Sequence, residues 1–204
     1  MLITDRHRFP TPEAGEVLAA AERTAVESAI ASGAGVVQLR EKDLDGDALL
    51  ARADVLRGIC HRHGAKLVVN DRVDVARMAA ADGVHLPASG LGVKEARALL
   101  PPGALVGCSA HSDAEIDAAA DADYLIFGPV YETPSKRGFG PPQGPDKLRR
   151  AVARAVVPVL AVGGIDPAGC PAVAEAGAAG VAAIRCLLDA PEQAAVMAGA
   201  FAQP

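Results

Sequence analysis

The stretch KLVVNDRVDVARMAAADGVHL, residues 66–86, holds two short apolar runs with a helical segment between them. Lys66–Asn70 and Gly83–Leu86 predict β-strands, and the Ala-rich segment Val73–Ala81 predicts a helix. A strand, a helix and a second strand in this order predict parallel pairing with a right-handed crossover. This unit decides the fold, because the rest of the chain repeats it.

The same alternation continues in both directions from this stretch. Further strands are predicted at Leu2–Thr4, Val36–Arg40, Leu105–Ser109, Tyr124–Val130, Pro158–Gly163 and Gly180–Ile184. Further helices are predicted at Pro12–Ser32, Asp47–His63, Val93–Leu100, Asp113–Ala120, Pro145–Ala155, Pro167–Ala176 and from Pro191 onward. Eight such units favour a closed barrel over an open doubly wound sheet, which more often has about five or six strands. We therefore predict an α/β fold, a single-domain (β/α)₈ TIM barrel spanning residues 1–204.

Composition limits the classes of partner. The 204 residues are half apolar, which suits one buried core. The net charge of −5 and an aromatic content of 3% argue against nucleic acid and anionic membranes as partners. The four Cys form no C-x-x-C pair, so we expect reduced thiols in a cytoplasmic protein. We expect no signal peptide and no membrane span, and a homo-oligomer is an open alternative to a monomer.

Polar clusters follow the carboxyl ends of the predicted strands, which in such a barrel meet at the catalytic mouth. The run Gln38-Leu39-Arg40-Glu41-Lys42 ends the second strand. Alternation along the strand places Gln38, Arg40 and Lys42 on one side, where three donors suit a polyanion such as a diphosphate. The alternative is a solvated run of charges. We favour the binding site, because Gln38 and Arg40 fall within the strand period.

Asn70 and Asp71 come at the end of the third strand. Mg²⁺ prefers carboxylates together with the oxygens of a substrate phosphate, so Asp71 is a candidate metal ligand. Asp71 could instead cap the helix that begins near Val73. Asp74 is the stronger candidate for that cap, which leaves Asp71 available to a ligand.

Two further clusters follow the fifth and sixth strands. Ser109 and His111 share a face if the fifth strand continues, and a neutral imidazole can move protons near pH 7. A structural role for His111 is an equally weighted alternative. The long loop over residues 128–144 carries Thr133, Ser135 and Lys136, which could close over a phosphate. The alternative for this segment is an ordinary surface loop.

The last two strands end in a pattern that suits phosphate. Gly164 follows the seventh strand, and Ile184 and Arg185 end the eighth. Phosphate sites in this fold commonly use backbone N–H groups at these two places. Glycine permits the backbone to approach a ligand closely.

The motifs occur in an ordered set: Q-L-R-E-K, V-N-D-R-x-D-x-A, G-V-H-L, G-x-S-x-H, A-D-Y-x-x-F-G-P-V-Y-x-T-x-S-K and A-V-G-G-I. Together they resemble the thiamine phosphate synthase/TenI superfamily, from about residue 3 to residue 189. The resemblance implies a TIM-barrel enzyme of the thiamine pathway. A synthase of that family joins hydroxymethylpyrimidine diphosphate to thiazole phosphate with Mg²⁺ and releases diphosphate.

The resemblance also implies roles for individual residues. The contacts to the pyrimidine diphosphate would be Gln38, Arg40, Lys42 and Asn70. Asp71 would bind Mg²⁺, and Ser109 and Lys136 would hold the diphosphate. The site of the thiazole phosphate would be formed by Thr133, Ser135, Gly164, Ile184 and Arg185.

Three positions depart from the synthase pattern. Gly90 stands where a second Mg²⁺ ligand, an Asp, is usual; Glu132 replaces a usual Pro, and Arg185 a usual Ser. Tyr131-Glu132-Thr133 is more similar to TenI, a thiazole tautomerase that needs neither diphosphate nor Mg²⁺. In a tautomerase the acid–base group would be His111.

The two activities make different demands on the chain. A tautomerase acting on a thiazole carboxylate phosphate has no need of Gln38, Lys42 or Asp71, and all three are present. The resemblance therefore favours the synthase, a transferase, with the tautomerase as the alternative. A non-catalytic phosphate-binding barrel ranks third, because fold alone does not fix function.

Overall fold

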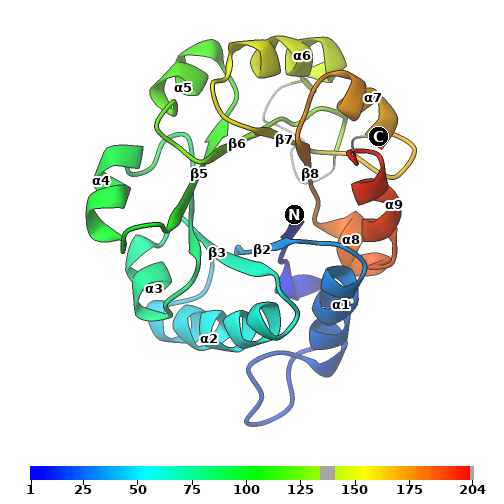
Figure 1. Cartoon of the computed structure of the whole chain (residues 1–204). Coiled ribbons are helices and arrows are strands. Elements are labelled where there is room, and N and C mark those ends of the chain that lie inside the picture. Colours follow the sequence, from blue (N-terminus) through cyan, green and yellow to red (C-terminus); the bar gives the residue numbers. More distant parts are fainter. Residues whose placement is uncertain (134–140, 203–204) are drawn as a thin grey trace.

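The computed structural model describes residues 1–133 and 141–202, and its strands form a ring that helices surround (Figure 1). Eight strands pair in chain order within one sheet, and every pairing is parallel. A bridge between Leu2 and Ala183 joins the first strand to the end of the last. The backbone N–H of Ile3 donates to the carbonyl of Ala183 at 2.9 Å. The predicted (β/α)₈ TIM barrel is therefore confirmed.

The strands are β1 (Leu2–Ile3), β2 (Val36–Leu39), β3 (Lys66–Asn70), β4 (Gly83–Leu86), β5 (Leu105–Ala110), β6 (Tyr124–Phe127), β7 (Val159–Val162) and β8 (Gly180–Ala182). The helices are α1 (Ala20–Ala31), α2 (Gly46–Arg62), α3 (Val73–Met78), α4 (Val93–Leu99), α5 (Asp113–Ala118), α6 (Gly144–Arg154), α7 (Cys170–Glu175), α8 (Arg185–Asp189) and α9 (Gln193–Gly199). A short 3-10 helix, η1 (Arg6–Arg8), follows β1.

The structure moves the start of one predicted helix and the end of one predicted strand, and it adds one helix. The helix predicted from Pro12 begins only at Ala20, because Gly15 has a φ of +87° that a right-handed helix does not permit. The strand predicted to reach Val130 ends at Phe127, since Pro129 has no N–H to donate to a neighbouring strand. The predictions also missed α8, which directly follows the eighth strand where we expected only loop.

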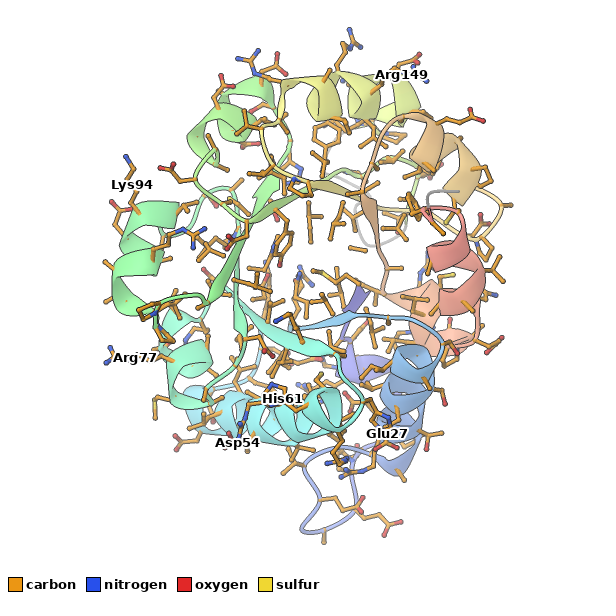
Figure 2. All side chains as sticks on the ribbon, in the orientation of Figure 1. Glu27, Asp54, His61, Arg77, Lys94 and Arg149 are labelled. Atoms are coloured by element: carbon orange, nitrogen blue, oxygen red, sulfur yellow. The ribbon has the colours of Figure 1, made fainter. Side chains whose placement is uncertain are left out.

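Hydrophobic side chains form two separate layers. A large cluster lies between the strands and the helices and includes Val37 of β2 and Leu56 of α2. A small cluster of Ile3, Tyr124, Ile126 and Ala182 occupies strand positions of the opposite parity. Side chains alternate across a strand, so this second cluster points into the barrel. In Figure 2 the charged side chains of Arg77, Lys94 and Arg149 project away from the barrel into solvent.

None of the helices in the described ranges is both long and apolar enough to cross a membrane.

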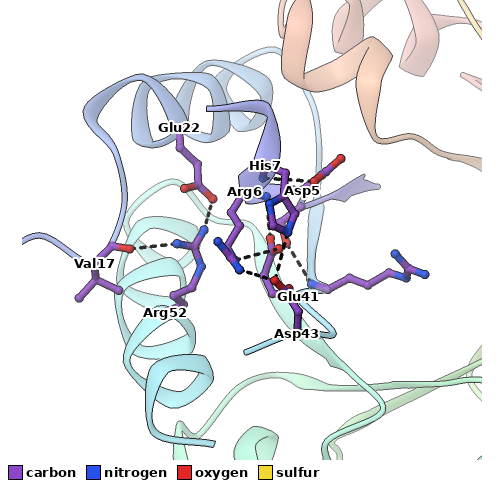
Figure 3. Close-up of polar contacts among 10 residues, drawn as sticks. Asp5, Arg6, His7, Val17, Glu22, Glu41, Asp43 and Arg52 are labelled. Atoms are coloured by element: carbon purple, nitrogen blue, oxygen red, sulfur yellow. Dashed lines mark hydrogen bonds and ion pairs between the residues drawn. The ribbon is translucent and has the colours of Figure 1, made fainter. Parts of the chain in front are cut away.

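A buried ion pair links α1 to α2. The Arg52 guanidinium donates to the Glu22 carboxylate, and the two side chains are only 5% and 2% exposed (Figure 3). Arg52 also donates to the carbonyl of Val17 at 2.9 Å. The irregular segment before α1 is thereby fixed to α2, even though it forms no regular structure of its own.

We expect Arg52→Met to destabilise the protein by about 3–5 kcal/mol, because it leaves the Glu22 carboxylate buried without its partner. The double variant with Glu22→Leu should recover most of that loss, since both charges are then gone. Urea unfolding followed by circular dichroism measures the free energies. Arg149→Met is the matched control, because Arg149 pairs with Asp146 at the exposed surface. Equal losses in the Arg52 and Arg149 variants would contradict the importance of the buried pair.

Candidate active site

The interior of the barrel is polar along one half of its wall and apolar along the other. The inward positions near the carboxyl ends of β2 to β5 are Gln38, Asn70, His85 and Ser109. The corresponding positions of β6 to β8 are Ile126, Val162 and Ala182. The predicted polar positions therefore gather on adjacent strands. Because these carboxyl ends form the mouth of the barrel, the mouth has one side rich in hydrogen-bonding groups.

The three predicted donors of β2 lie at different depths. Gln38 is 2% exposed inside the barrel, with its Nε2 at 3.5 Å from the sulfur of Met1. Arg40 is half-buried just beyond the strand, and its backbone N–H donates to the Thr4 hydroxyl oxygen at 3.0 Å. Lys42 is exposed in the turn that follows. The strand ends at Leu39, so alternation along the strand does not itself orient Lys42.

Sequence reasoning missed Glu41, which lies in the same run. Its side chain is buried, and it accepts the backbone N–H of Arg6 at 3.0 Å (Figure 3). Burial raises the pKa of Glu41, and a hydrogen bond from Thr4 partly offsets that increase. Glu41 thus anchors the segment after β1 to the end of β2, where Arg40 is located. A carboxylate between two cations was the only signal of this role in the sequence.

Asp71 stands in a backbone conformation unusual for a non-glycine residue. Its φ is +67°, its N–H donates to the carbonyl of His85 at 2.8 Å, and its carbonyl accepts from Val73 at 3.0 Å. The side chain is exposed at the mouth. The backbone hydrogen bond to β4 therefore holds Asp71 at the end of β3 while leaving its carboxylate accessible.

The prediction that Asp74 caps α3 is wrong. The N-cap position is occupied by Arg72, which makes no side-chain cap bond, and Asp74 lies within the first turn. The Arg72 guanidinium donates to both carboxylate oxygens of Asp74, at 2.9 and 2.6 Å. This hydrogen bonding from Arg72 lowers the pKa of Asp74. The strongest partner of the Asp74 carboxylate is therefore the Arg72 guanidinium.

Gly90 faces Asp71 across the loops that follow β3 and β4. A Cβ placed on Gly90 would lie 3.3 Å from Asp71 Oδ1 and 2.7 Å from Pro87 Cγ. A longer side chain at position 90 would therefore reach the Asp71 carboxylate, but Pro87 restricts the space. No group of three or more His, Cys, Asp or Glu side chains suited to a metal occurs in residues 1–133 and 141–202. Asp71 is the carboxylate that position 90 faces.

His85 lies in the motif G-V-H-L but was not among the predicted site residues. His85 is 2% exposed, and its Nε2 lies 2.9 Å from Ser109 Oγ. The ring stacks on Tyr124, with centroids 5.7 Å apart and an interplanar angle of 24°. Burial, with a smaller effect from the Arg40 charge, lowers the pKa of His85 to about 3. The imidazole is therefore neutral near pH 7. The sequence alone did not indicate this role, because the burial of His85 depends on closure of the barrel.

His111 has different partners from Ser109. β5 ends at Ala110, and the His111 Nδ1 lies 2.6 Å from the carbonyl oxygen of Gly128. A carbonyl can only accept, so Nδ1 carries a proton, and in the neutral ring the lone pair is on Nε2. The backbone N–H of His111 donates to Glu115 at 2.6 Å. The expectation of one shared Ser109–His111 face is replaced by two separate positions, one inside the barrel and one at its rim.

A cavity of about 930 Å³ lies at the ends of β7 and β8. It brings together four of the predicted phosphate-site residues: Thr133, Gly164, Ile184 and Arg185. The fifth predicted residue of this region, Ser135, and Lys136 of the predicted diphosphate set lie outside the described residues. The residues predicted to form a second binding region thus line one cavity, which is separate from the polar wall of β2 to β5.

The backbone and charges of this cavity suit an anion. Gly164 has a φ of +64°, and a Cβ there would lie 2.5 Å from the carbonyl oxygen of Glu132, so only glycine fits. The guanidinium of Arg8 is bound by both carboxylate oxygens of Asp189. Arg185 has no ion pair with any residue in the described ranges. Arg185 is therefore the cation of this cavity that remains available to a ligand.

The chain is similar to known proteins over most of its length. The sequence model described as "Thiamine monophosphate synthase" matches residues 1–187. A Geobacter sulfurreducens protein is 46% identical over 193 residues, covering 94% of this chain and 87% of the relative. The thiamine-phosphate synthase of Methanocella arvoryzae is 45% identical over 163 residues, covering 79% of this chain and 77% of that protein. These matches confirm the resemblance found in the motifs.

Solved structures agree with the sequence matches. The thiamine phosphate pyrophosphorylase of Pyrococcus furiosus superposes with a TM-score of 0.82 at 28% identity, covering 98% of this chain and 96% of the other. The orotidine 5'-phosphate decarboxylase of Pyrococcus horikoshii superposes with a TM-score of 0.65 at 13% identity, covering 98% and 97%. The second likeness concerns the fold alone.

We expect His85 to make stability depend on pH. Its pKa of about 3 in the folded chain is below the ordinary value of 6.5, so only the unfolded chain takes up this proton between those values. The contribution of neutral His85 is complete above pH 6.5 and falls below it, by up to about 1.4 kcal/mol per pH unit. Urea unfolding at several pH values should show a shallower dependence for His85→Phe than for the wild type. His63→Gln, at the exposed end of α2, is the control. An unchanged pH dependence in His85→Phe would contradict the assignment.

Proposed function

Because the chain belongs to the thiamine monophosphate synthase family, we propose that it joins hydroxymethylpyrimidine diphosphate to thiazole phosphate, forming thiamine phosphate and diphosphate. It is then a transferase, acting as a single-domain cytoplasmic enzyme, either alone or as a homo-oligomer. One observation carries the proposal. The mouth has two distinct binding regions, a polar wall on β2 to β5 and a cavity at β7 and β8, as two phosphorylated substrates require.

The polar wall is the proposed diphosphate region. Its donors are Gln38, Arg40, Lys42, Asn70 and Ser109, with Lys136 supplied by the loop after β6. Inward placement of the β2, β3 and β5 residues supports this assignment. Donors and cations fixed before the reaction stabilise the charge that accumulates on a departing diphosphate.

The cavity at β7 and β8 is the proposed thiazole phosphate region. Gly164 lets the backbone approach the phosphate, and Arg185 supplies a positive charge that no described carboxylate neutralises. Thr133, Ser135 and the backbone at Ile184 complete the proposed set. This arrangement holds the thiazole ring between its own phosphate and the pyrimidine.

The reaction then needs one bond to break and one to form. The bond between the pyrimidine methylene carbon and the diphosphate oxygen breaks, and its electron pair leaves with the diphosphate. The thiazole nitrogen donates its lone pair to the methylene carbon and forms the new C–N bond. The protein orients the two substrates and stabilises the leaving group.

Asp71 would hold a Mg²⁺ ion in this reaction. Its exposed carboxylate next to the diphosphate donors fits the ion, since Mg²⁺ usually keeps several waters and binds about one or two carboxylates plus substrate phosphate oxygens. The ion would supply positive charge to the departing diphosphate. Gly90 provides no second carboxylate, so the ligands of the ion would be Asp71 and the phosphate oxygens of the substrate.

A second candidate function rests on His111. Its Nδ1–H is fixed by the Gly128 carbonyl, which leaves Nε2 free to accept a proton, as the base of a thiazole tautomerase would. We rank this activity below the synthase, because it gives no use to Gln38, Lys42 or Asp71. A non-catalytic phosphate-binding barrel remains the third candidate.

We expect the purified protein to form thiamine phosphate from the pyrimidine diphosphate and thiazole phosphate when Mg²⁺ is present. Product is measured by chromatography after conversion to a fluorescent thiochrome. A parallel reaction offers only the thiazole carboxylate phosphate tautomer. Turnover of that tautomer alone, with no effect of a chelator, would overturn the synthase and support the tautomerase.

Two variants separate the activities further. Asp71→Ala should lower synthase kcat/KM by about 100-fold or more, equivalent to about 2.7 kcal/mol, and leave any tautomerase activity unchanged. His111→Ala should affect the tautomerase more strongly. Equal losses of both activities in both variants would show that this division of roles is wrong.

We expect Gly90→Asp to tighten Mg²⁺ binding about tenfold, or about 1.4 kcal/mol, because the new carboxylate would lie beside Asp71. Calorimetric titration of Mg²⁺ in the presence of inorganic diphosphate measures the affinity. Gly90→Asn is the matched control, since it has the same size and meets the same restriction from Pro87 without a charge. If both variants bind Mg²⁺ equally well, position 90 does not reach the metal.

A further inference from the structure

His85 makes its strongest contact with a residue of the proposed diphosphate region. Its Nε2 lies 2.9 Å from Ser109 Oγ, and its ring is buried within the barrel below the mouth. Within the described part of the chain, the other ring nitrogen, Nδ1, is buried and has no hydrogen-bond partner. The two ring nitrogens therefore have unequal surroundings, and these decide where the proton of the neutral ring is located.

The proton belongs on Nε2. A neutral imidazole carries one N–H, and a buried N–H without an acceptor is destabilising, because it loses its hydrogen bonds to water. Unpaired buried N–H groups are rarer in proteins than incompletely satisfied acceptors. A proton on Nδ1 would create such an unpaired donor, whereas a proton on Nε2 is donated to Ser109 Oγ.

This tautomer determines what Ser109 can offer to a ligand. A serine hydroxyl has one proton and two lone pairs. When His85 occupies one lone pair, the Ser109 proton stays available to an acceptor at the mouth. The opposite tautomer would draw that proton toward His85, and Ser109 would present only lone pairs to an anionic oxygen.

We propose that His85 is a positioning residue which, as the Nε2–H tautomer, donates to Ser109 and directs the Ser109 hydroxyl proton toward the diphosphate. This inference rests on the proposed function, because it takes the anion beside Ser109 to be the diphosphate of the pyrimidine substrate.

The surroundings of His85 hold the ring in the required orientation. The ring stacks on Tyr124, and a Cβ on Gly107 would overlap the Tyr124 ring, so the missing side chain at position 107 makes room for the stack. The carbonyl of His85 accepts the N–H of Asp71 at 2.8 Å. One residue thus fixes the backbone of the proposed metal ligand and the hydroxyl of the proposed diphosphate donor.

His85 acts through Ser109 and not as an acid or base. The ring is 2% exposed, its Nε2 is engaged by Ser109 and its Nδ1 is buried, so neither ring nitrogen is presented to a substrate. His111 at the rim is the histidine with an accessible lone pair. The two histidines of the mouth therefore have different tautomers and different roles.

The test measures binding of inorganic diphosphate, with Mg²⁺ present, by calorimetry. Ser109→Ala and His85→Phe should each weaken binding about tenfold or more, as expected for the loss of a hydrogen bond to a charged group. The double variant should bind no more weakly than the weaker single variant, because both changes remove one interaction. His85→Gln, whose amide N–H can replace the Nε2 donor, should restore binding to within about threefold of the wild type.

The tautomer has its own readout in the intact wild-type protein. Long-range ¹H–¹⁵N correlation spectra of ¹⁵N-histidine-labelled protein should show the His85 proton on Nε2. This spectrum keeps the proposal testable even if His85→Phe does not fold. An Nδ1–H pattern, additive losses in the double variant, no rescue by His85→Gln, or no binding of diphosphate by the wild type would overturn it. Neither readout needs product formation, so a failure of synthase activity alone would be a failure of the proposed function and not of this inference.

Discussion

The alternation of side chains along eight parallel strands is the constraint on which the rest of this structure depends. Each strand sends one set of residues outward to the helices and the other set into the barrel. Because the strands are all parallel, their carboxyl ends meet on one face. The inward polar residues of β2 to β5 therefore come together without any loop having to place them.

Position along the chain was enough to predict much of this arrangement. Gly164 and Arg185 were predicted from their places after the last two strands, and both line the same cavity. The place of Asp71 at the end of β3 was predicted in the same way. Part of the argument was that Asp74 caps α3, and this was wrong, since Asp74 binds Arg72. Local patterns indicate where a strand ends and which residues follow it.

Other features depend on contacts between distant segments, and the sequence could not reveal them. The roles of His85 and Glu41 rest on their burial and hydrogen bonds, which depend on the neighbouring strands and on the segment after β1. The helix predicted at Pro12–Ser32 begins only at Ala20, because Gly15 takes a positive φ and because a hydrogen bond from Arg52 to the Val17 carbonyl fixes the segment before α1. Tertiary contacts override helix propensity at such places.

The closure of the barrel has a consequence for how the protein is made. The N–H of Ile3 pairs with the carbonyl of Ala183, so the first strand obtains its second neighbour only from nearly the last strand. During synthesis, β1 can pair with β2, but its other edge and the growing edge of the sheet stay unpaired until β8 has left the ribosome. Contacts this distant in sequence slow folding, and unpaired strand edges favour aggregation meanwhile. For most of translation the nascent chain therefore exposes strand edges that the finished barrel hides.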